Sequence, residues 1–246
     1  MAGYLQKPPF PVLDVGHPLA RGLVGCWSVY EGGGLTLHDV SCRQNHGTFG
    51  EVNSAKPTWA RSVFGHSIFC DDAGYVLIPH DADQTGDKLT AEVWFDIEAL
   101  ASVPGRYYYV MLKPHGDPVV SWCLYVDDAD DKLTVIVYDD SKANIDIKSD
   151  SALVSGTLYH AVLTIDGTAT MYLNAVAQAD TDTTATVYPA TGNLFLSYSA
   201  GDYQLDGHIH KAAMWNRALS QQEISLLYHD PFCHVRSKSF NRLLCR

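Results

Sequence analysis

The sequence lacks long apolar runs, paired cysteines and a high density of charge. No apolar run approaches roughly 18 residues, so we expect no membrane-spanning helix. Charged residues make up only 18% of the 246 residues and hydrophobic residues 46%, as in ordinary globular β proteins. None of the six cysteines forms a CxxC pair. Cys26, Cys70 and Cys123 lie in strand-like runs, where buried free thiols are expected and disulfides are the alternative.

The sequence also lacks the signatures of several enzyme classes and of nucleic-acid binding. It has no GxSxG elbow, no HExxH segment and no glycine-rich phosphate loop. The formal net charge is −11 and no stretch of the body carries a basic groove, which argues against nucleic acid as a partner. A chain of this length suits one large β domain that can fold without stabilising disulfide bonds or metal ions.

The two ends of the chain differ from its body. Residues 1–21 are punctuated by prolines and lack the charged and apolar regions of a signal peptide. We expect an extended arm there, in a protein that is kept inside the cell or assembled into a particle there. Residues 230–246 carry one acidic and four basic residues, a net of +3, together with apolar residues such as Phe232 and Leu244. Such a tail is either a solvated end or a segment that docks on a neighbouring subunit.

The body closes with a strand, a corner and a short helix. Both alternating sets of Gly207–Trp215 mix polar and apolar residues, so the strand has no cleanly buried face. Ser220 and Glu223 form a capping box that starts a helix, and the helix ends before Pro231. The segment WNRALS between strand and helix resembles the closing motif of laminin-G-like domains in the concanavalin A-like lectin/glucanase superfamily. The usual form of that motif is roughly GxIDDVRIYNRALS.

A second motif lies near the start of the body, in HPLARGLVGCWSVYEGGGLTLHDVSCRQNHGTFG. It is similar to the opening of laminin-G-like domains of bacteria and phages, roughly NPLxRGLVGxWxFxEGxG followed by DxSGNxNHGT. Asp39, Ser41, Asn45 and His46 keep their places, whereas Cys42-Arg43-Gln44 replaces the usual Gly-Asn segment. The resemblance spans roughly residues 18–231.

About a dozen short strands separated by turns, with one helix, predict an all-β fold. We expect a two-sheet antiparallel jelly-roll sandwich of the concanavalin A-like kind, with one short C-terminal helix. The expected organisation is an arm at residues 1–21, the jelly roll at 22–229 and the tail at 230–246.

Some members of this superfamily are glucanases, which carry a catalytic site. The resemblance implies two carboxylates on one strand face, as ExDxE or ExDxxE, and retaining chemistry needs them about 5 Å apart. The nearest match is residues 94–98, where Trp94 stands at the nucleophile position before Asp96 and Glu98. Glu92 shares their face, an alternation that a strand with one solvated side also explains. We predict no enzyme activity.

Calcium is the ion that the resemblance implies, held by oxygen atoms from loops. The candidate ligands are Glu31, Asp39, Asn45 and Asp72. The alternative is that Asp39 and Asn45 satisfy the backbone of turns, as these residue types often do.

The closing strand departs from the family pattern in a way that bears on metal binding. The resemblance would add acidic ligands at two positions where this chain has His210 and Lys211, and a lysine disfavours a nearby cation. His208 and His210 share a strand face and could chelate zinc with a third ligand. Two exposed histidines without a metal are the simpler interpretation.

Sugar binding by such folds uses aromatic rings that stack on sugar faces, together with polar side chains. The candidates chosen here are Tyr107, Trp122, Tyr125 and Tyr203, from an available set that also includes Tyr108, Tyr109, Tyr138 and Tyr198. Because the chain has 14 tyrosines, many of them are expected to cover the sheets instead.

These features together predict a non-catalytic binding and structural module. The favoured hypothesis is a phage virion component, assembled in the host cytoplasm, that decorates a capsid or associates with a tail or fibre. Its arm and tail would dock on protein subunits of the assembly or on further copies of the chain, and the sandwich would hold a surface glycan. A freestanding calcium-dependent lectin is the alternative, and a divergent glycoside hydrolase is the least favoured. Neither nucleic acid nor a membrane is an expected partner.

Overall fold

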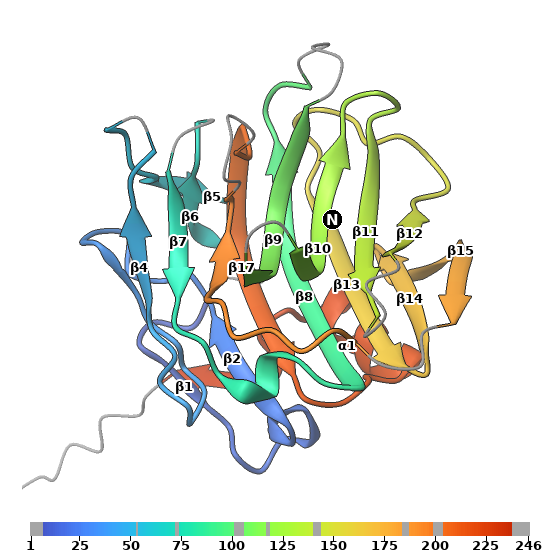
Figure 1. The fold of residues 1–246 in the computed structure, drawn as a ribbon. Coiled ribbons are helices and arrows are strands. Elements are labelled where there is room, and N and C mark those ends of the chain that lie inside the picture. Colours follow the sequence, from blue (N-terminus) through green and yellow to red (C-terminus); the bar gives the residue numbers. More distant parts are fainter. Residues whose placement is uncertain are drawn as a thin grey trace, which may run out of the picture.

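The computed structural model describes residues 7–52, 54–71, 74–100, 106–116, 119–139, 144–183, 187–198 and 204–237. Within these residues two large antiparallel sheets lie face to face, and Figure 1 shows one of them in front of the other. We call them the front sheet and the back sheet. No helix in this part of the chain is long and apolar enough to cross a membrane.

The front sheet has the strand order β12-β11-β10-β9-β16-β7-β4-β3. Its strands are β3 (Thr36–Leu37), β4 (Gly47–Gly50), β7 (Tyr75–Ile78), β9 (Tyr107–Gly116), β10 (Val119–Asp127), β11 (Lys132–Tyr138), β12 (Asn144–Lys148) and β16 (Leu194–Leu196).

The back sheet has the order β15-β14-β13-β8-β17-β6-β5, and one further strand, β2, also pairs with β17. Its strands are β2 (Leu23–Trp27), β5 (Thr58–Ser62), β6 (Gly65–Phe69), β8 (Lys88–Ile97), β13 (Tyr159–Asp166), β14 (Thr168–Leu173), β15 (Val176–Thr183) and β17 (Gly207–Trp215).

The sandwich core lies between the sheets and is filled by alternating residues of the strands. In β8 this set is Leu89, Ala91, Val93, Phe95 and Ile97, as the alternation predicts. The other face of β8 is also largely buried, because a second layer covers the outer face of the back sheet.

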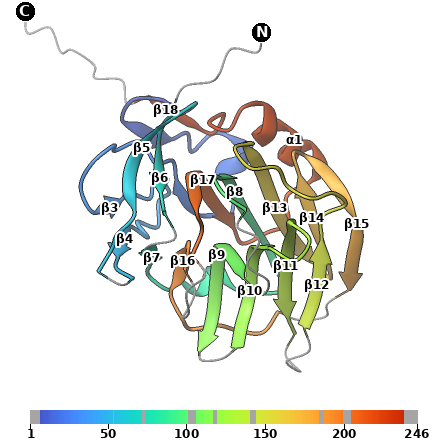
Figure 2. The same cartoon turned by 90° about the horizontal axis from the view of Figure 1, so that it is seen from above.

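This second layer consists of helix α1 (Gln221–His229), the 3₁₀ turn η1 (Pro18–Ala20) and a small ribbon. Ile224 and Leu227 of α1 pack against Val162, Ala213 and Trp215 of the back sheet. The ribbon pairs β1 (Pro11–Leu13) with β18 (Val235–Ser237). Figure 2 shows α1 and β18 on the side of the molecule away from the front sheet. A second 3₁₀ turn, η2 (Ala82–Gln84), is not part of this layer, because its Gln84 backbone oxygen accepts from Trp122 of the sandwich core.

A bulge in β17 explains why neither alternating set of this strand is clean. The pairing of β17 with β8 shifts between Ile209 and Lys211. Ile209 and Ala212 therefore face the sandwich core, while His210 and Lys211 both bond to outer-face side chains. The bulge places two consecutive polar side chains under the second layer.

The predicted all-β antiparallel sandwich with one C-terminal helix is confirmed. Parts of the predicted arm and tail pack on the sandwich: Leu13 and Leu19 join the cluster under α1, and so does Val235. The predicted free thiols Cys26, Cys70 and Cys123 are confirmed as buried and unbridged. Burial raises the pKa of each of these three thiols to about 12.

Candidate functional site

The outer face of the front sheet carries a continuous set of aromatic side chains, which we call the aromatic band. These rings are on the strand faces opposite the core, because they alternate with core residues such as Val76, Tyr108 and Leu124. The band consists of Tyr75, Tyr107, Tyr109, Tyr125, Tyr138, Phe195 and Tyr198.

The rings of the band fix one another in place. Tyr198 stacks on Phe195 with ring centroids 4.5 Å apart, and lies 4.7 Å from Tyr75. Tyr125 meets Tyr107 edge-on at 5.1 Å and Tyr109 at 5.5 Å. These separations are typical of favourable aromatic pairs. The band is therefore a preorganised apolar surface with hydroxyl groups at its edges.

Polar groups border the band at β12. The Asn144 amide donates a hydrogen bond to the Asp146 carboxylate at 3.1 Å, and both residues are exposed. Burial raises the pKa of Tyr125 and Tyr138 above the ordinary tyrosine value, and the charge of Asp146 adds to the effect. An exposed acceptor, an exposed amide and protonated phenols thus lie beside aromatic faces, the combination that binds the hydroxyl and C–H surfaces of sugars.

The four predicted ligand-binding residues fall into different places. Tyr107 belongs to the band and is 39% exposed. Tyr125 belongs to it too, but is 6% exposed, since its neighbours in the band cover it. Trp122 is fully buried in the sandwich core, where its indole N–H donates to the backbone oxygen of Gln84 at 3.2 Å. Its ring therefore offers no face to a ligand. Tyr203 lies outside the described residues.

Two aromatic residues of the band, Tyr75 and Phe195, were missed from the sequence. Tyr75 alternates with the buried residues Val76 and Ile78 along β7, and Phe195 lies between the buried Leu194 and Leu196. Alternation in these short strands was the signal that could have identified both.

Within the part of the chain that the structure describes, the predicted calcium ligands Glu31 and Asp39 belong to no group of three or more histidine, cysteine or carboxylate side chains that could hold a metal ion. Both oxygens of the Asp39 carboxylate already accept hydrogen bonds from the protein. The donors are the backbone N–H groups of Cys26, Ser41 and Asn45, at 2.8–2.9 Å, and the Ser41 hydroxyl, at 2.6 Å. Asn45 donates from its side chain to the Val24 backbone oxygen and to Asp81. These residues hold the turns of the first hairpin together.

Glu31 has a different environment, and Asp72 lies outside the described residues. One carboxylate oxygen of Glu31 accepts from the backbone N–H of His38 at 2.6 Å and is 3.0 Å from its Nδ1. The other oxygen, Oε2, is buried and has no hydrogen-bond partner. Glu31 therefore retains an oxygen atom that the hairpin does not use.

His208 and His210 flank one carboxylate on the outer face of the back sheet. Asp96 accepts from His208 through Oδ1 at 3.0 Å and from His210 through Oδ2 at 2.7 Å. The Ser62 hydroxyl occupies the remaining nitrogen of His210 at 2.7 Å. Across the described residues, no three histidine, cysteine or carboxylate side chains are placed to hold a metal.

The remaining carboxylate of β8, Glu92, is on the same outer face. Glu92 is fully buried and accepts from the Lys211 ammonium at 2.6 and 2.8 Å, with His160 at 3.1 Å. Burial opposes ionisation of Glu92, but Lys211 and His160 outweigh it and lower its pKa to about 2. The acidic residues that share this strand face are thus on the sheet opposite the aromatic band.

The fold, together with the closing motif, defines a class of protein. A laminin-G family model, described as the concanavalin A-like lectin/glucanases superfamily, matches residues 71–225, and the chain belongs to this family. The predicted resemblance is confirmed. No curated protein matches the chain.

Solved structures share the fold at low sequence identity. Domain 4 of AbnA, an extracellular arabinanase from Geobacillus stearothermophilus in complex with arabinotriose, has a TM-score of 0.69 at 16% identity, covering 84% of this chain and 98% of that one. The binding domain of Paraclostridial Mosquitocidal Protein 1 also has a TM-score of 0.69, at 14% identity, covering 87% of this chain and 53% of that one. Trypanosoma rangeli sialidase has a TM-score of 0.65 at 18% identity, and the match covers 96% of this chain but 37% of the sialidase.

Proposed function

We propose that this domain is a non-catalytic glycan-binding module and that the aromatic band is its binding face. The observation that carries the proposal is the set of mutually packed rings beside the exposed Asn144 and Asp146. Sugar rings stack on such aromatic faces while carboxylate and amide groups bind their hydroxyls. The arabinanase domain bound to arabinotriose supports a glycan as the ligand class.

Binding to arabinotriose and to a glycan array tests this proposal. Tyr107→Ala removes the most exposed ring of the band and is expected to raise Kd about fivefold to tenfold, the effect of losing about 1 kcal/mol of ring contact. Asp146→Asn should also weaken binding. Phe10→Ala is the matched control, since Phe10 is an exposed aromatic residue in the segment before β1, away from the band. Failure of the wild-type chain to bind any glycan would overturn the proposal.

The same measurements separate the alternative functions. Binding that a chelator abolishes would favour a calcium-dependent lectin. Turnover of a glycan that disappears in Glu98→Gln would favour a glycoside hydrolase. We expect binding that resists chelation and no turnover.

We further propose that the module is a structural component of an assembly, with a phage virion as the favoured setting. The supporting observation is that the β1–β18 ribbon lies on the side of α1, away from the front sheet (Figure 2), whose outer face carries the aromatic band. Attachment through the terminal segments would then leave the band facing outward. The tail carries +3 in a chain of net charge −11, so the rest carries −14, and the acidic body of a second copy is a suitable partner.

Sedimentation and negative-stain imaging of the purified chain test the assembly. The full chain is expected to form oligomers, and a chain that ends at residue 237 should remain monomeric while it still binds glycan. Oligomers formed equally well by the shortened chain would contradict docking through the tail.

A further inference from the structure

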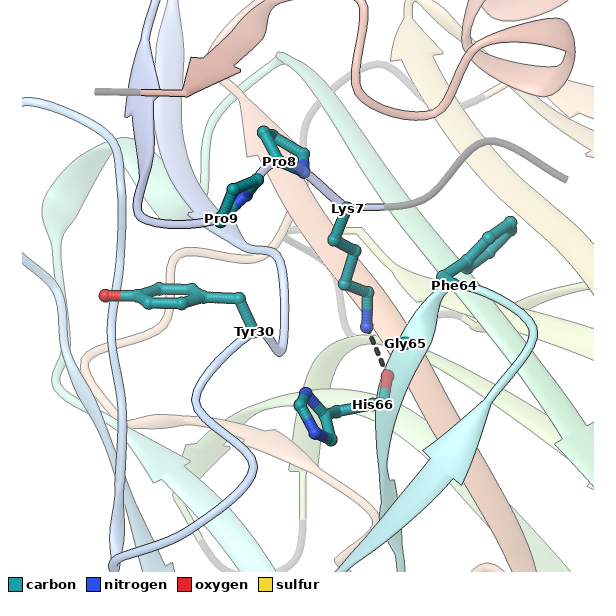
Figure 3. A pocket seen from close by; sticks show the side chains of 7 residues that line it. All are labelled: Lys7, Pro8, Pro9, Tyr30, Phe64, Gly65 and His66. Carbon is teal, nitrogen blue, oxygen red and sulfur yellow. Dashed lines mark hydrogen bonds between the residues drawn. The ribbon is translucent and has the colours of Figure 1, made fainter. Parts of the chain in front are cut away.

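Lys7, just before the first strand, buries its side chain in the body of the domain. Its ammonium donates to the backbone oxygen of Val29 at 3.0 Å and to that of His66. Figure 3 shows the side chain pointing down between Phe64 and Tyr30 toward His66. A backbone hydrogen bond from Lys7 N–H to the Phe64 oxygen, at 3.2 Å, holds the main chain in place. The lysine is thus seated at both its backbone and its side-chain end.

The atoms around the ammonium form a socket for a cation. Val29 has φ of 52°, a left-handed conformation that a β-branched residue rarely adopts, and its carbonyl oxygen bonds the lysine. Such strain persists only where the surrounding structure over-determines it, often at ligand clamps. The buried Glu31 Oε2 has no hydrogen-bond partner, and Glu31 acts electrostatically on Lys7. Carbonyl and carboxylate oxygens of this kind are the groups that bind a hard cation.

Burial lowers the pKa of Lys7 to about 7 and the charge of Lys211 adds to this effect, whereas the charge of Glu31 opposes it and favours the ammonium form. The positive charge of Lys7 also helps to lower the pKa of His210, after burial, which is the larger cause. His210 is at one of the two closing-strand positions where the family pattern has an acidic residue. A neutral or basic side chain therefore occurs where a metal would need a carboxylate.

We propose that the Lys7 ammonium is the resident cation of the socket formed by the Val29 and His66 carbonyl oxygens, on which the Glu31 carboxylate acts electrostatically, and that it replaces the calcium ion that the sequence resemblance implies. The segment carrying Lys7 is thereby latched to the turn after β2 and to β6. The domain does not depend on calcium for its stability. A pocket of about 250 Å³ adjoins the lysine, lined by Pro8, Pro9, Tyr30, Phe64, Gly65 and His66 (Figure 3).

Thermal unfolding with calcium chloride or a chelator tests this proposal on the whole chain. The wild-type melting temperature is expected to be the same in both. Lys7→Met should melt about 5 °C lower, because it leaves two carbonyl oxygens and Glu31 without their cation, and should not respond to calcium. Lys7→Ala leaves space in the socket, so calcium should recover at least half of its loss. Lys7→Ala combined with Glu31→Gln should lose that recovery.

Two results would overturn the proposal: a wild-type chain that calcium stabilises, or a Lys7→Ala variant that calcium does not. If Lys7→Ala fails to fold, acetylation of the native wild-type chain with acetic anhydride gives the answer. Lys7 should be protected until the chain unfolds, whereas Lys88, whose side chain is 62% exposed, should react at once. Equal reactivity of Lys7 and Lys88 would show that the socket does not hold the lysine.

Discussion

At the scale of single residues, the outer face of the back sheet buries an ion pair. The Lys211 ammonium and the Glu92 carboxylate are both fully buried, and they satisfy each other with His160 as a third partner. Trp94 stacks on His160 with centroids 4.7 Å apart, and Tyr228 of α1 stacks on Trp94 in turn. Such pairs add little net stability, but removing one partner leaves a charge uncompensated in a dry environment.

Glu92→Gln is therefore expected to destabilise the domain by about 3–5 kcal/mol, since it strands the Lys211 charge. Glu92→Leu combined with Lys211→Met should recover most of the loss. Denaturant unfolding measures the free energy of unfolding of the single variant and of the double variant. Glu98→Gln is the matched control on the same strand face, where the side chain is half exposed, and should change stability by less than about 0.5 kcal/mol. Similar unfolding of the Glu92 and Glu98 variants would contradict the importance of the pair.

A second residue-scale prediction concerns acid. Burial lowers the pKa of His234 to about 3, and the Lys211 charge contributes. Below about pH 6.5 the unfolded chain takes up a proton at this histidine but the folded chain does not. The free energy of unfolding should therefore fall as the pH drops from about 6.5 toward 3, by up to about 1.4 kcal/mol per pH unit from this group.

His234→Phe keeps a ring and removes the titration, so its stability should depend less steeply on pH between about pH 7 and about pH 5. The contribution of His208 to the free energy of unfolding changes with pH in the opposite direction. Its hydrogen bond to Asp96 raises its pKa, so its contribution is full below about pH 6.5 and is lost as the pH rises through the folded-state pKa. His208→Gln should steepen the loss of stability in acid. Parallel pH profiles for the wild type and both variants would rule out this assignment.

At the scale of elements, α1 depends on its first turn. The Ser220 hydroxyl accepts from the backbone N–H of Glu223 at 3.3 Å, and the Glu223 carboxylate accepts from the backbone N–H of Ser220 at 2.9 Å. Arg217 bonds the same carboxylate and, as the largest cause, lowers its pKa to about 2. This cap fixes the helix above the buried layer of the back sheet.

Ser220→Ala should cost about 1 kcal/mol, which corresponds to a fall of about 2–4 °C in melting temperature for a domain of this size. Ser225→Ala, in the middle of the same helix, is the control and should be neutral or slightly stabilising, because alanine favours the helix interior. A loss in Ser225→Ala as large as that in Ser220→Ala would mean that the cap is not the cause.

The elements also show what the sequence could predict. WNRALS and the capping box are local signals, and β17 followed by α1 occurs where they indicate. The bulge between Ile209 and Lys211 is not local, because it depends on pairing with β8. The β1–β18 ribbon joins two strands of three residues each from opposite ends of the chain, too short for any periodicity.

The site was predicted less well than the fold, for a physical reason. In β10 one face carries Trp122 and Leu124 and the other carries Cys123 and Tyr125, so both alternating sets are apolar or aromatic. Sequence alternation alone therefore does not show which face of β10 points toward the sandwich core. Trp122 was predicted to bind the ligand but lies in the core, whereas Tyr107, which was also predicted to bind it, is on the outer face.

At the scale of the whole molecule, the sandwich has two unlike outer faces. The front sheet presents the aromatic band, and the back sheet is covered by α1 and by the terminal segments. Phe232 and Val235 are buried in this cover, so residues 230–237 belong to the folded unit.

Two truncations should therefore behave differently. A chain that ends at residue 237 is expected to melt within about 2 °C of the wild type. A chain that ends at residue 229 loses Phe232 and Val235, whose burial is worth about 1.5–3 kcal/mol each, and should be strongly destabilised. Equal melting temperatures for the two would show that the ribbon adds nothing to the fold.

Because Pro11 of β1 lies opposite Ser237 of β18, segments from the two halves of the described chain run side by side at one point of the surface, about 5 Å apart as in any paired strands. A host protein can accept the whole unit in place of a single surface turn without being pulled apart. The unit is thus suited to transfer between carrier proteins, by evolution or by design, while the aromatic band keeps its arrangement.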